Sequence, residues 1–483
     1  MKLKNIITAV FGVVFITCCV SCKKGWLDVK PEKSLVLPKT IADFQALLDN
    51  TDANRGAGIR FNTWQPSLDE VGADDFYVTS SDWNSSQTHT KNAYIWASEI
   101  FPDVDPGNRL DWEYPYKRIF YCNIVLEGLE NIVPVTVSEQ IAWKQAKGHA
   151  LFLRAYSHYT VAQLFCKPYT KNQAATDLGI PLRLESDINI PSVRSTVQAT
   201  YDQIIADLRS ALELLPVATP IANNPTYIYR PTQAATNAML ARVYLSMEDY
   251  ENALKYANES LNLYSTLINF NLFRRKGANG QFLNGHTYTR TTNTEILFDN
   301  SLIDYSILRT NRCIVDSSLY KMYDSSDLRK TMFFFLINNR PGHSFFGSYI
   351  GNGAVYFSGL ATDEMYLIRS ECNARLGNVG AAMYDLNTLL RNRWDEKMPY
   401  TDIAETDPDK ALRIILNERR KELCFRGLRW TDLRRLNKDT RFAVTLTRQI
   451  NGNTYTLEPN SKYYVLPFPP EVIQLSNMQQ NPR

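Results

Sequence analysis

The sequence predicts a mostly α-helical protein, in which tetratricopeptide-like helical hairpins form a scaffold for a large loop-rich region with minor β-structure. Paired stretches of helical periodicity, rich in alanine and aromatic residues and joined by short breaks, predict the hairpins. Residues 264–360, rich in Asn, Gly, Ser, Thr and aromatic residues, predict the loops. A loop region of this size is usually functional or disordered, and its many aromatic residues argue against disorder, so we expect it to bind a ligand.

The first residues are typical of an exported lipoprotein. Two lysines precede an uncharged apolar run over residues 6–20, and Cys22 follows it after a small residue. The run is shorter than the ~20 residues that a membrane-spanning helix needs. We therefore expect residues 1–21 to be a lipoprotein signal peptide, Cys22 to be lipidated and to anchor the chain to a membrane, and residues 22–40 to form the tether. An ordinary secretory peptide with an incidental cysteine is the alternative.

Residues 41–263 are expected to form an N-terminal helical region with tetratricopeptide-like hairpins. Small and aromatic residues alternate along it, as at Ala155 and Tyr156, and such faces let neighbouring helices approach closely. A short break at Glu248 and Asp249 joins two antiparallel helices. The expected helices span residues 111–130, 141–165, 201–215, 233–247 and 250–263.

Residues 264–483 are expected to form a C-terminal region. It divides into a loop-rich part, a helical part and a tail, over residues 264–360, 361–436 and 437–483. The helical part repeats the hairpin, with helices over 362–376 and 379–393 and a turn at Gly377 and Asn378.

Charge and cysteine content exclude two classes of protein. The chain has 53 basic and 50 acidic residues, a net charge of +3, and it loses two lysines with the signal peptide, so no electrostatic case for nucleic-acid binding exists. The cysteines that follow Cys22 are scattered and odd in number, which indicates buried thiols instead of a disulfide framework. They are Cys122, Cys166, Cys313, Cys372 and Cys424.

Catalytic and metal-binding motifs are absent from the sequence. It contains no His-Glu-x-x-His, Gly-x-Ser-x-Gly, phosphate-binding or dinucleotide-binding motif, and its histidines lack ligand spacing. Asp103, Asp105 and Gly107 are similar to a calcium loop, but the twelfth position is Tyr114 instead of Glu. We therefore expect no enzyme activity, no cofactor and no metal.

Aromatic side chains in the loops are the candidate ligand-binding residues. A pyranose ring presents an apolar face of C–H groups on which a Trp or Tyr ring can stack, while Asp, Asn and Arg side chains bond its hydroxyls. For each aromatic a place in the core is the alternative, and we assign Trp96 and Trp112 to it. The candidates are Trp83, Tyr77, Trp64, Tyr288 and Tyr349 as stacking rings, with Asp75, Asn84 and Arg290 as polar partners.

A series of short motifs runs in one order along nearly the whole mature chain. After Cys22 they lie at residues 26–31, 112–123, 153–156, 179–182, 386–393, 418–435, 466–469 and 480–482. Together they resemble the RagB/SusD family of nutrient-uptake outer-membrane lipoproteins. Two positions depart from the family: Arg426 stands where an acidic residue commonly precedes the glycine, and Lys23-Lys24 stand where surface-exported relatives are often acidic.

The resemblance implies a SusD-like fold and a location and function that the residues alone do not give. The protein would be lipid-anchored at the cell outer membrane and surface-exposed. It would bind a nutrient, most often an oligosaccharide or other glycan, and deliver it to a partner SusC-like TonB-dependent outer-membrane transporter.

Two alternatives stay open from the sequence. The first is a lipid-anchored glycoside hydrolase, for which Asp69-Glu70 and Asp74-Asp75 would supply paired carboxylates, although spacing shows neither the separation nor the raised pKa that this chemistry requires. The second is a structural scaffold of a transporter complex. The charged run at 418–435 is expected to brace the fold, with acidic and basic residues paired along its helix.

Overall fold

The computed structural model describes most of the chain after the tether. The described residues are 38–50, 61–63, 65–102, 109–217, 227–337, 340–351 and 355–483. The expected signal peptide, the lipidation site Cys22, the candidate Trp64 and the calcium-like stretch from Asp103 to Gly107 lie outside them. Contacts group residues 41–483 as one compact unit, within which the following elements lie.

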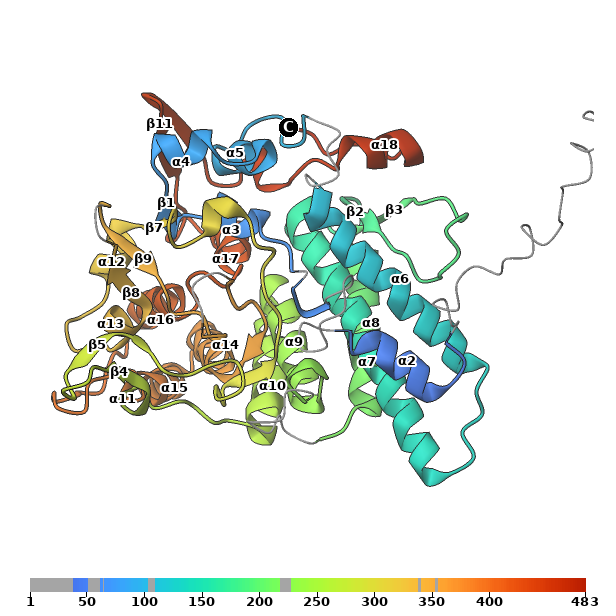
Figure 1. Cartoon of the computed structure of the whole chain (residues 1–483), viewed down its shortest axis with the longest axis horizontal. Helices are drawn as coiled ribbons and strands as arrows, with labels where there is room; N and C mark the ends of the chain where they lie inside the picture. The colour runs from blue at the N-terminus through green and yellow to red at the C-terminus, as the bar shows by residue number, and fades with distance from the viewer. Residues whose placement is uncertain are drawn as a thin grey trace, which may run out of the picture. The chain divides into compact units, whose positions relative to one another are not determined.

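Helices packed side by side in chain order form the scaffold (Figure 1). They are α6 (Leu110–Glu130), α7 (Val137–Phe165), α8 (Val197–Leu214), α9 (Gln233–Ser246), α10 (Tyr250–Leu263), α14 (Thr362–Arg375), α15 (Val379–Arg391) and α16 (Pro408–Glu422). The mostly α, hairpin-built fold class is confirmed. Because α10 packs directly on α14, the loop-rich segment between them projects from the stack as one long insertion.

Small side chains explain how closely the hairpin helices pack. Ala234 and Ala238 of α9 and Ala253 and Ala257 of α10 are all completely buried, and alanine faces bring two backbones close together. The Ser260 hydroxyl then donates a hydrogen bond across the pair to the Ala234 carbonyl (2.9 Å). The α9–α10 hairpin therefore buries the face that the sequence pattern predicts.

The start of α7 lies four residues before the predicted position. Thr136 is its N-cap: the Thr136 hydroxyl accepts from the Glu139 amide (3.2 Å), and the Glu139 carboxylate accepts from the Thr136 amide (2.9 Å). This capping box satisfies two amides that the first turn leaves without helical partners. The apolar periodicity begins later because this first turn is exposed to solvent.

Short strand pairs connect the loops. Every sheet formed by the described residues consists of two strands, which run antiparallel. They are β1 (Phe76–Tyr77) with β7 (Ile314–Val315), β2 (Leu178–Pro181) with β3 (Arg194–Thr196), β4 (Arg274–Lys276) with β5 (Phe282–His286), β6 (Ile296–Phe298) with β10 (Leu360–Ala361), β8 (Phe334–Leu336) with β9 (His343–Phe345), and β11 (Leu446–Ile450) with β12 (Asn453–Leu457). Two of these pairs, β1–β7 and β6–β10, join segments distant in the sequence, and β1–β7 ties the insertion to the N-terminal part of the chain.

Shorter helices complete the described fold. They are α2 (Ile41–Leu48), α3 (Leu68–Gly72), α4 (Ser80–Asn84), α5 (Thr88–Tyr94), α11 (Phe270–Phe273), α12 (Ser317–Lys321), α13 (Arg329–Phe333), α17 (Arg429–Leu436) and α18 (Pro470–Ser476). The cysteines of the described residues are buried and unpaired, as expected from their spacing.

Candidate functional site

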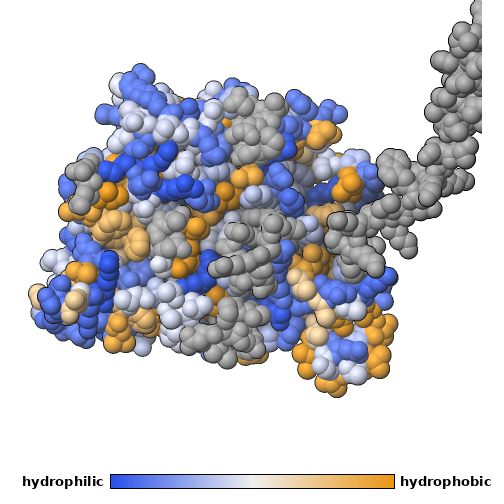
Figure 2. All heavy atoms as spheres, viewed as in Figure 1, coloured by the Kyte–Doolittle hydropathy of each residue, from blue (hydrophilic) through white to orange (hydrophobic). Residues whose placement is uncertain are grey.

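Three segments of chain meet around α4 and form the candidate site. The β1–β7 pair, in which Tyr77 lies opposite Ile314, brings the insertion against the segment before α4. The β11–β12 hairpin approaches from the C-terminal part, so β1, α4, β7 and β11 lie together in Figure 1. We call Tyr77, Trp83, Asn84, Arg312 and Arg340 the α4 face. Figure 2 shows the surface over α4 and β11 to be mostly hydrophilic.

The Trp83 ring of the α4 face is held by a hydrogen bond, and the Tyr77 ring lies beside Gly342. Trp83 is half-buried, and its indole N–H donates to the Lys91 carbonyl (3.1 Å). Tyr77 keeps 37% of its surface exposed. A Cβ at Gly342 would lie 3.3 Å from the Tyr77 hydroxyl, and φ of Gly342 is +78°. Glycine therefore fits this position both because it lacks a side chain and because it adopts a positive φ without strain. A fixed, partly exposed ring can stack on a ligand without a large loss of side-chain entropy.

A hairpin turn supplies the amide groups of the site. Asn84 and Asn451 exchange two side-chain hydrogen bonds (3.3 and 3.0 Å). The backbone N–H of Asn451 donates to the Ser80 hydroxyl (2.9 Å). Asn451 and Gly452 have φ of +52° and +79°, as a two-residue type I′ turn requires. The Asn-Gly pair could have signalled this turn from the sequence. Its contact with α4 could not be read there.

Two arginines complete the α4 face, and sequence reasoning missed both. Arg340 forms an ion pair with Asp82 (2.6 Å) and donates to the Asn311 and Arg312 carbonyls. Arg312 donates to the hydroxyl of Ser85 (3.1 Å) and to that of Ser86. Burial alone would raise the pKa of Asp82, but hydrogen bonds from Thr79 and Arg340 outweigh it and hold this pKa below its usual value. No sequence motif marks these arginines, because their contacts join segments more than 200 residues apart.

The structure removes three predicted residues from any solvent-facing site. Tyr288 is 1% exposed and stacks on His286, with 3.6 Å between ring centroids. Tyr349 is fully buried, and its hydroxyl contacts Glu295. Asp75 is also fully buried and pairs with Arg420 (3.1 Å). A ligand that arrives from solvent cannot reach these side chains, because the core packs around them.

Arg290 lies apart from the α4 face. It contacts Asp299 (3.3 Å) and the hydroxyls of Tyr229 and Ser301 (3.2 Å each). Of the predicted ligand residues, Tyr77 in β1 and Trp83 and Asn84 in α4 keep part of their surface exposed to solvent.

A hollow lies elsewhere, between α6, residues 181–192 and α18. Its volume is about 640 Å³, and Trp112, Tyr116 and Phe120 form an aromatic wall along α6. Trp112 is only 8% exposed and packs on the core ring of Phe165, which agrees with its assignment to the core. This groove is the main competitor of the α4 face for a ligand.

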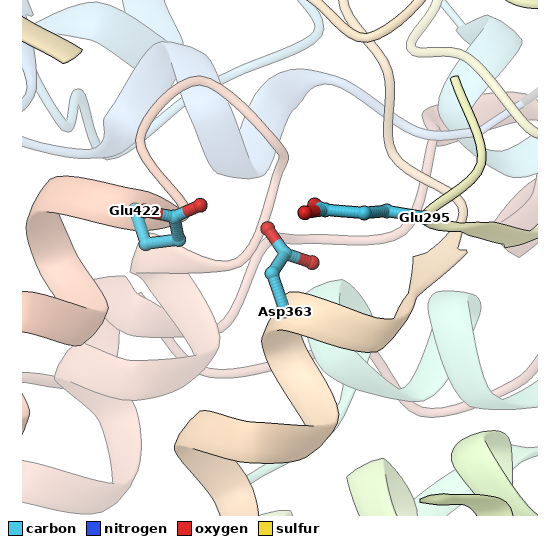
Figure 3. Close-up of side chains that lie close together, drawn as sticks. All are labelled: Glu295, Asp363 and Glu422. Carbon is cyan, nitrogen blue, oxygen red and sulfur yellow. The ribbon is translucent and has the colours of Figure 1, made fainter. Parts of the chain in front are cut away.

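Glu295, Asp363 and Glu422 form a buried acidic cluster (Figure 3). Their oxygens lie within 4.8 Å of one another, which is close enough to hold a metal ion. Arginines already neutralise them: Arg393 bonds both Glu295 and Glu422 (2.8 Å each), and Arg426 bonds Asp363 (2.8 Å). These guanidinium groups take the place that a cation would occupy, so the cluster supports no metal proposal. Arg426, the departure from the family pattern, acquires its partner here.

Glu295 shares a proton with its neighbours. The Tyr349 hydroxyl lies 2.5 Å from Glu295 Oε2 and 2.8 Å from Asp363 Oδ2. A hydroxyl has one proton, so both contacts can be hydrogen bonds only if one carboxyl is protonated. Burial, against the opposing charge of Arg393, raises the pKa of Glu295 to about 7, with Asp363 and Glu422 adding to the rise. Glu295 is therefore the carboxyl that takes up a proton as the pH falls through about 7.

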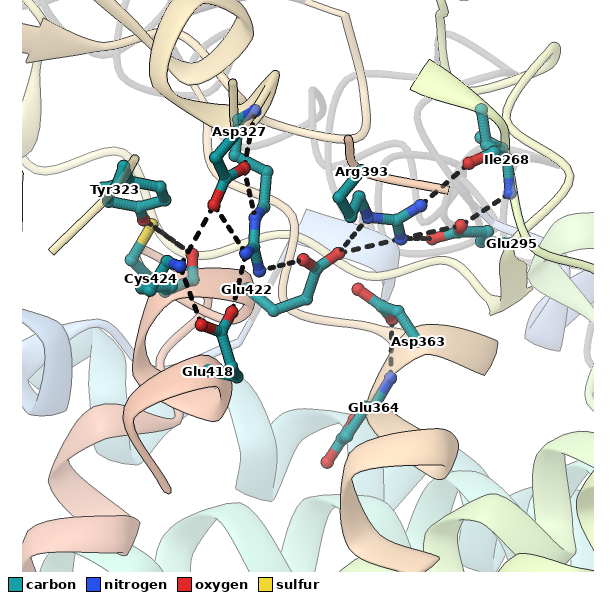
Figure 4. A network of polar contacts seen from close by, with 12 residues as sticks. Ile268, Glu295, Tyr323, Asp327, Asp363, Glu364, Arg393, Glu418, Glu422 and Cys424 are labelled. Carbon is teal, nitrogen blue, oxygen red and sulfur yellow. Dashed lines mark hydrogen bonds and ion pairs between the residues drawn. The ribbon is translucent and has the colours of Figure 1, made fainter. Parts of the chain in front are cut away.

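The charged run at 418–435 is buried and braces the fold (Figure 4). Arg329, which is completely buried, bonds Asp327 (2.7 Å), Glu418 (2.6 Å) and Glu422 (2.8 Å). Glu418 and Glu422 thus take a partner from the insertion, besides the helical neighbour Lys421 of Glu418 (2.7 Å). The expectation of pairing along one helix was too local, since Arg329 of the loop-rich region pairs with both Glu418 and Glu422 of α16.

Family models identify the relatives of this chain. One, described as starch-binding and associating with the outer membrane, matches residues 25–245, and one described as the SusD family matches residues 362–483. The chain belongs to the SusD/RagB family. No curated protein matches it. Along the described parts of this SusD-family protein, no helix has the length and apolar character needed to cross a bilayer.

Solved structures share the fold at low sequence identity. A putative sugar binding protein from Bacteroides vulgatus is 21% identical with a TM-score of 0.70, over 92% of this chain and 99% of that one. A SusD superfamily protein from Bacteroides thetaiotaomicron is 20% identical with a TM-score of 0.68, over 92% and 100%. A laminarin binding SusD-like protein is 18% identical with a TM-score of 0.62, over 92% and 100%. These likenesses establish the fold of this SusD-family chain.

Proposed function

We propose that this protein is an outer-membrane lipoprotein that binds a glycan and delivers it unchanged to a partner SusC-like TonB-dependent transporter. Membership of the SusD/RagB family is the observation that carries this proposal. The names of the sugar binding and laminarin binding structural neighbours favour a carbohydrate as the nutrient. Acylated Cys22 would anchor the protein to the membrane, facing the cell surface.

The α4 face is the proposed glycan site. Tyr77 and Trp83 present partly exposed rings to the C–H face of a pyranose, and Asn84 with Asn451 offers amide groups to its hydroxyls. Stacking and amide hydrogen bonds recognise a sugar without breaking a bond in it. The site therefore suits binding and release.

Buried carboxylates argue against the hydrolase alternative. Asp69 and Glu70 are almost completely buried, and burial raises the pKa of both well above the usual range. Asp74 pairs with Arg429 (2.7 Å), and burial removes Asp75 from solvent. Paired catalytic carboxylates must flank a substrate bond, and these four do not line an accessible site.

A glycan array with the purified protein tests the function and the site together. We expect wild-type protein to bind a set of glycans and to release no new reducing ends. Trp83→Ala and Tyr77→Ala should each weaken binding about tenfold, which corresponds to ~1.4 kcal/mol, at unchanged thermal stability. Phe120→Ala in the α6–α18 groove is the matched control and should bind as wild type does.

The outcomes separate the function from its location. Loss of binding in Phe120→Ala with retention in Trp83→Ala would move the site to the groove. New reducing ends would indicate a hydrolase. No binding to any glycan, with an intact complex at the outer membrane, would favour the structural scaffold.

Anchor and partner need their own measurement. We expect mass spectrometry of native protein to find fatty acyl chains on Cys22, and the protein to co-purify with a transporter from detergent-solubilised outer membranes. Acyl-free protein in the soluble fraction would contradict the anchor.

A further inference from the structure

Positive charge is concentrated on the α4 face and at the neighbouring Lys91 of α5. Lys91, Arg312 and Arg340 surround the segment that contains Trp83, and Asp82 is the carboxylate among them. Arg340 is paired with Asp82, whereas Arg312 and Lys91 take part in no ion pair among the described residues. The adjacent Arg309 adds no net charge, because it pairs with Asp304 (2.7 Å).

This arrangement differs from that of other arginines in the protein. Arg329, Arg393 and Arg435 are buried and each bonds two or more carboxylates, so their charges are compensated within the fold. Arg312 makes its hydrogen bonds to uncharged oxygens, namely the hydroxyls of Ser85 and Ser86 and the Asp82 carbonyl. Its charge helps to lower the pKa of Asp82, but Asp82 forms its ion pair with Arg340, so Arg312 can still pair with an external anion.

The charges lie beside the aromatic and amide groups. Lys91 Nζ is 5.6 Å from the centroid of the Trp83 ring, and the Lys91 carbonyl holds the indole N–H. Arg312 contacts Ser85, the residue after Asn84. A sugar stacked on Trp83 would therefore place its substituents within reach of two cations, and carboxylate and sulfate are groups that arginine and lysine recognise.

We propose that the ligand of the α4 face is an acidic glycan, in which uronic carboxylates or sulfate groups pair with Arg312 and Lys91. This proposal rests on the proposed function and narrows it to a class of glycan. Neutral sugars would keep the stacking contact but lose the charge pairing. Affinity for the acidic ligand would fall with ionic strength, because exposed pairs are screened by salt.

Charge-removing variants in the otherwise intact mature protein provide the test. Binding of an oligogalacturonide, a sulfated oligosaccharide and a neutral malto-oligosaccharide of equal length is measured at low and at high salt. We expect an acidic probe to bind about tenfold more tightly than the neutral probe at low salt, and Lys91→Gln and Arg312→Gln each to reduce this preference about threefold. Lys91→Arg should restore it.

A matched control lies on α10. Lys255 also lies near an aromatic ring, 5.2 Å from the centroid of Tyr256, and Lys255→Gln should leave all three affinities unchanged. If Arg312→Gln does not fold, Lys91→Gln alone tests the proposal, because the Lys91 side chain makes few contacts and its replacement should leave the fold intact.

The outcomes are distinct. Equal affinity for acidic and neutral probes, unaffected by Lys91→Gln and by salt, would overturn the acidic-glycan proposal and leave glycan binding intact. An acidic preference lost equally in Lys255→Gln would also overturn it. No binding to any of the probes or to the wider array would refute the proposed function, and the acidic ligand with it.

Discussion

Replacing Arg393 by methionine tests whether the buried charge network stabilises the fold. The Arg393 guanidinium donates to Glu422 (2.8 Å), to both oxygens of Glu295 (2.8 and 3.0 Å) and to the Ile268 carbonyl (2.8 Å), and it lies 4.1 Å from the centroid of the Phe270 ring. The variant would leave Glu295 without its ion-pair partner among the described residues. Breaking a buried pair in this way costs about 3–5 kcal/mol.

The lower end of that range is the expected value. Glu295 has a pKa of about 7 and can respond to the loss by taking up a proton, and methionine can keep part of the contact with Phe270. Glu422 keeps its second partner, Arg329. We therefore expect Arg393→Met to lower the free energy of unfolding by about 3 kcal/mol at neutral pH.

Arg391 provides the control two residues away. It pairs with Asp402, but the two side chains are 47% and 51% exposed, so Arg391→Met should cost less than about 1 kcal/mol. Urea unfolding followed by far-UV circular dichroism measures both, as shifts in midpoint at constant slope. An equal loss of unfolding free energy in the two variants, under about 1 kcal/mol in each, would refute the reasoning. Desolvation and close pairing would then not make the buried network more sensitive to the loss of a charge than an exposed ion pair is.

Two further predictions concern pH and backbone conformation. The pKa of Glu295 is raised from 4.5 to about 7, so the stabilisation by its protonation is fully present below pH ~4.5 and is lost as the pH rises through about 7. Relative to Glu295→Gln, the wild type should lose on the order of 3 kcal/mol of unfolding free energy across this pH range. A pH-independent difference between the two proteins would contradict this. Gly427 has φ of +70° and a Cβ there would lie 3.0 Å from Leu302, so Gly427→Ala should destabilise the protein by about 1–2 kcal/mol. Gly380, in the first turn of α15, has open space where a Cβ would lie, so Gly380→Ala should stabilise the protein by about 0.5–1 kcal/mol. Thermal melts that rank the two variants in the opposite order would show the strain argument to be wrong.

Three of the five residues of the α4 face were candidates from the sequence, and the physical reason is that these three lie close together along the chain. Tyr77, Trp83 and Asn84 lie on one short segment before and within α4, so the sequence alone places them near one another. Their membership of one face with Arg312 and Arg340 depends on the β1–β7 pairing and on the ion pair with Asp82, which join distant segments. Such long-range pairings cannot be predicted from the local sequence.

The sequence by itself determined the helices, their pairing into hairpins and the family. These follow from local periodicity and from breaks such as Gly377, whose positive φ ends α14, and they need no knowledge of distant contacts. Tertiary structure alone decided which aromatic residues face solvent. Tyr288 and Tyr77 look alike in the sequence, yet one is packed in the core and the other is exposed, because burial depends on the chain segments that fold over each ring. The same dependence gave the acidic residues of α16 their partner from the insertion, since a desolvated charge must find its counterion wherever the fold places one.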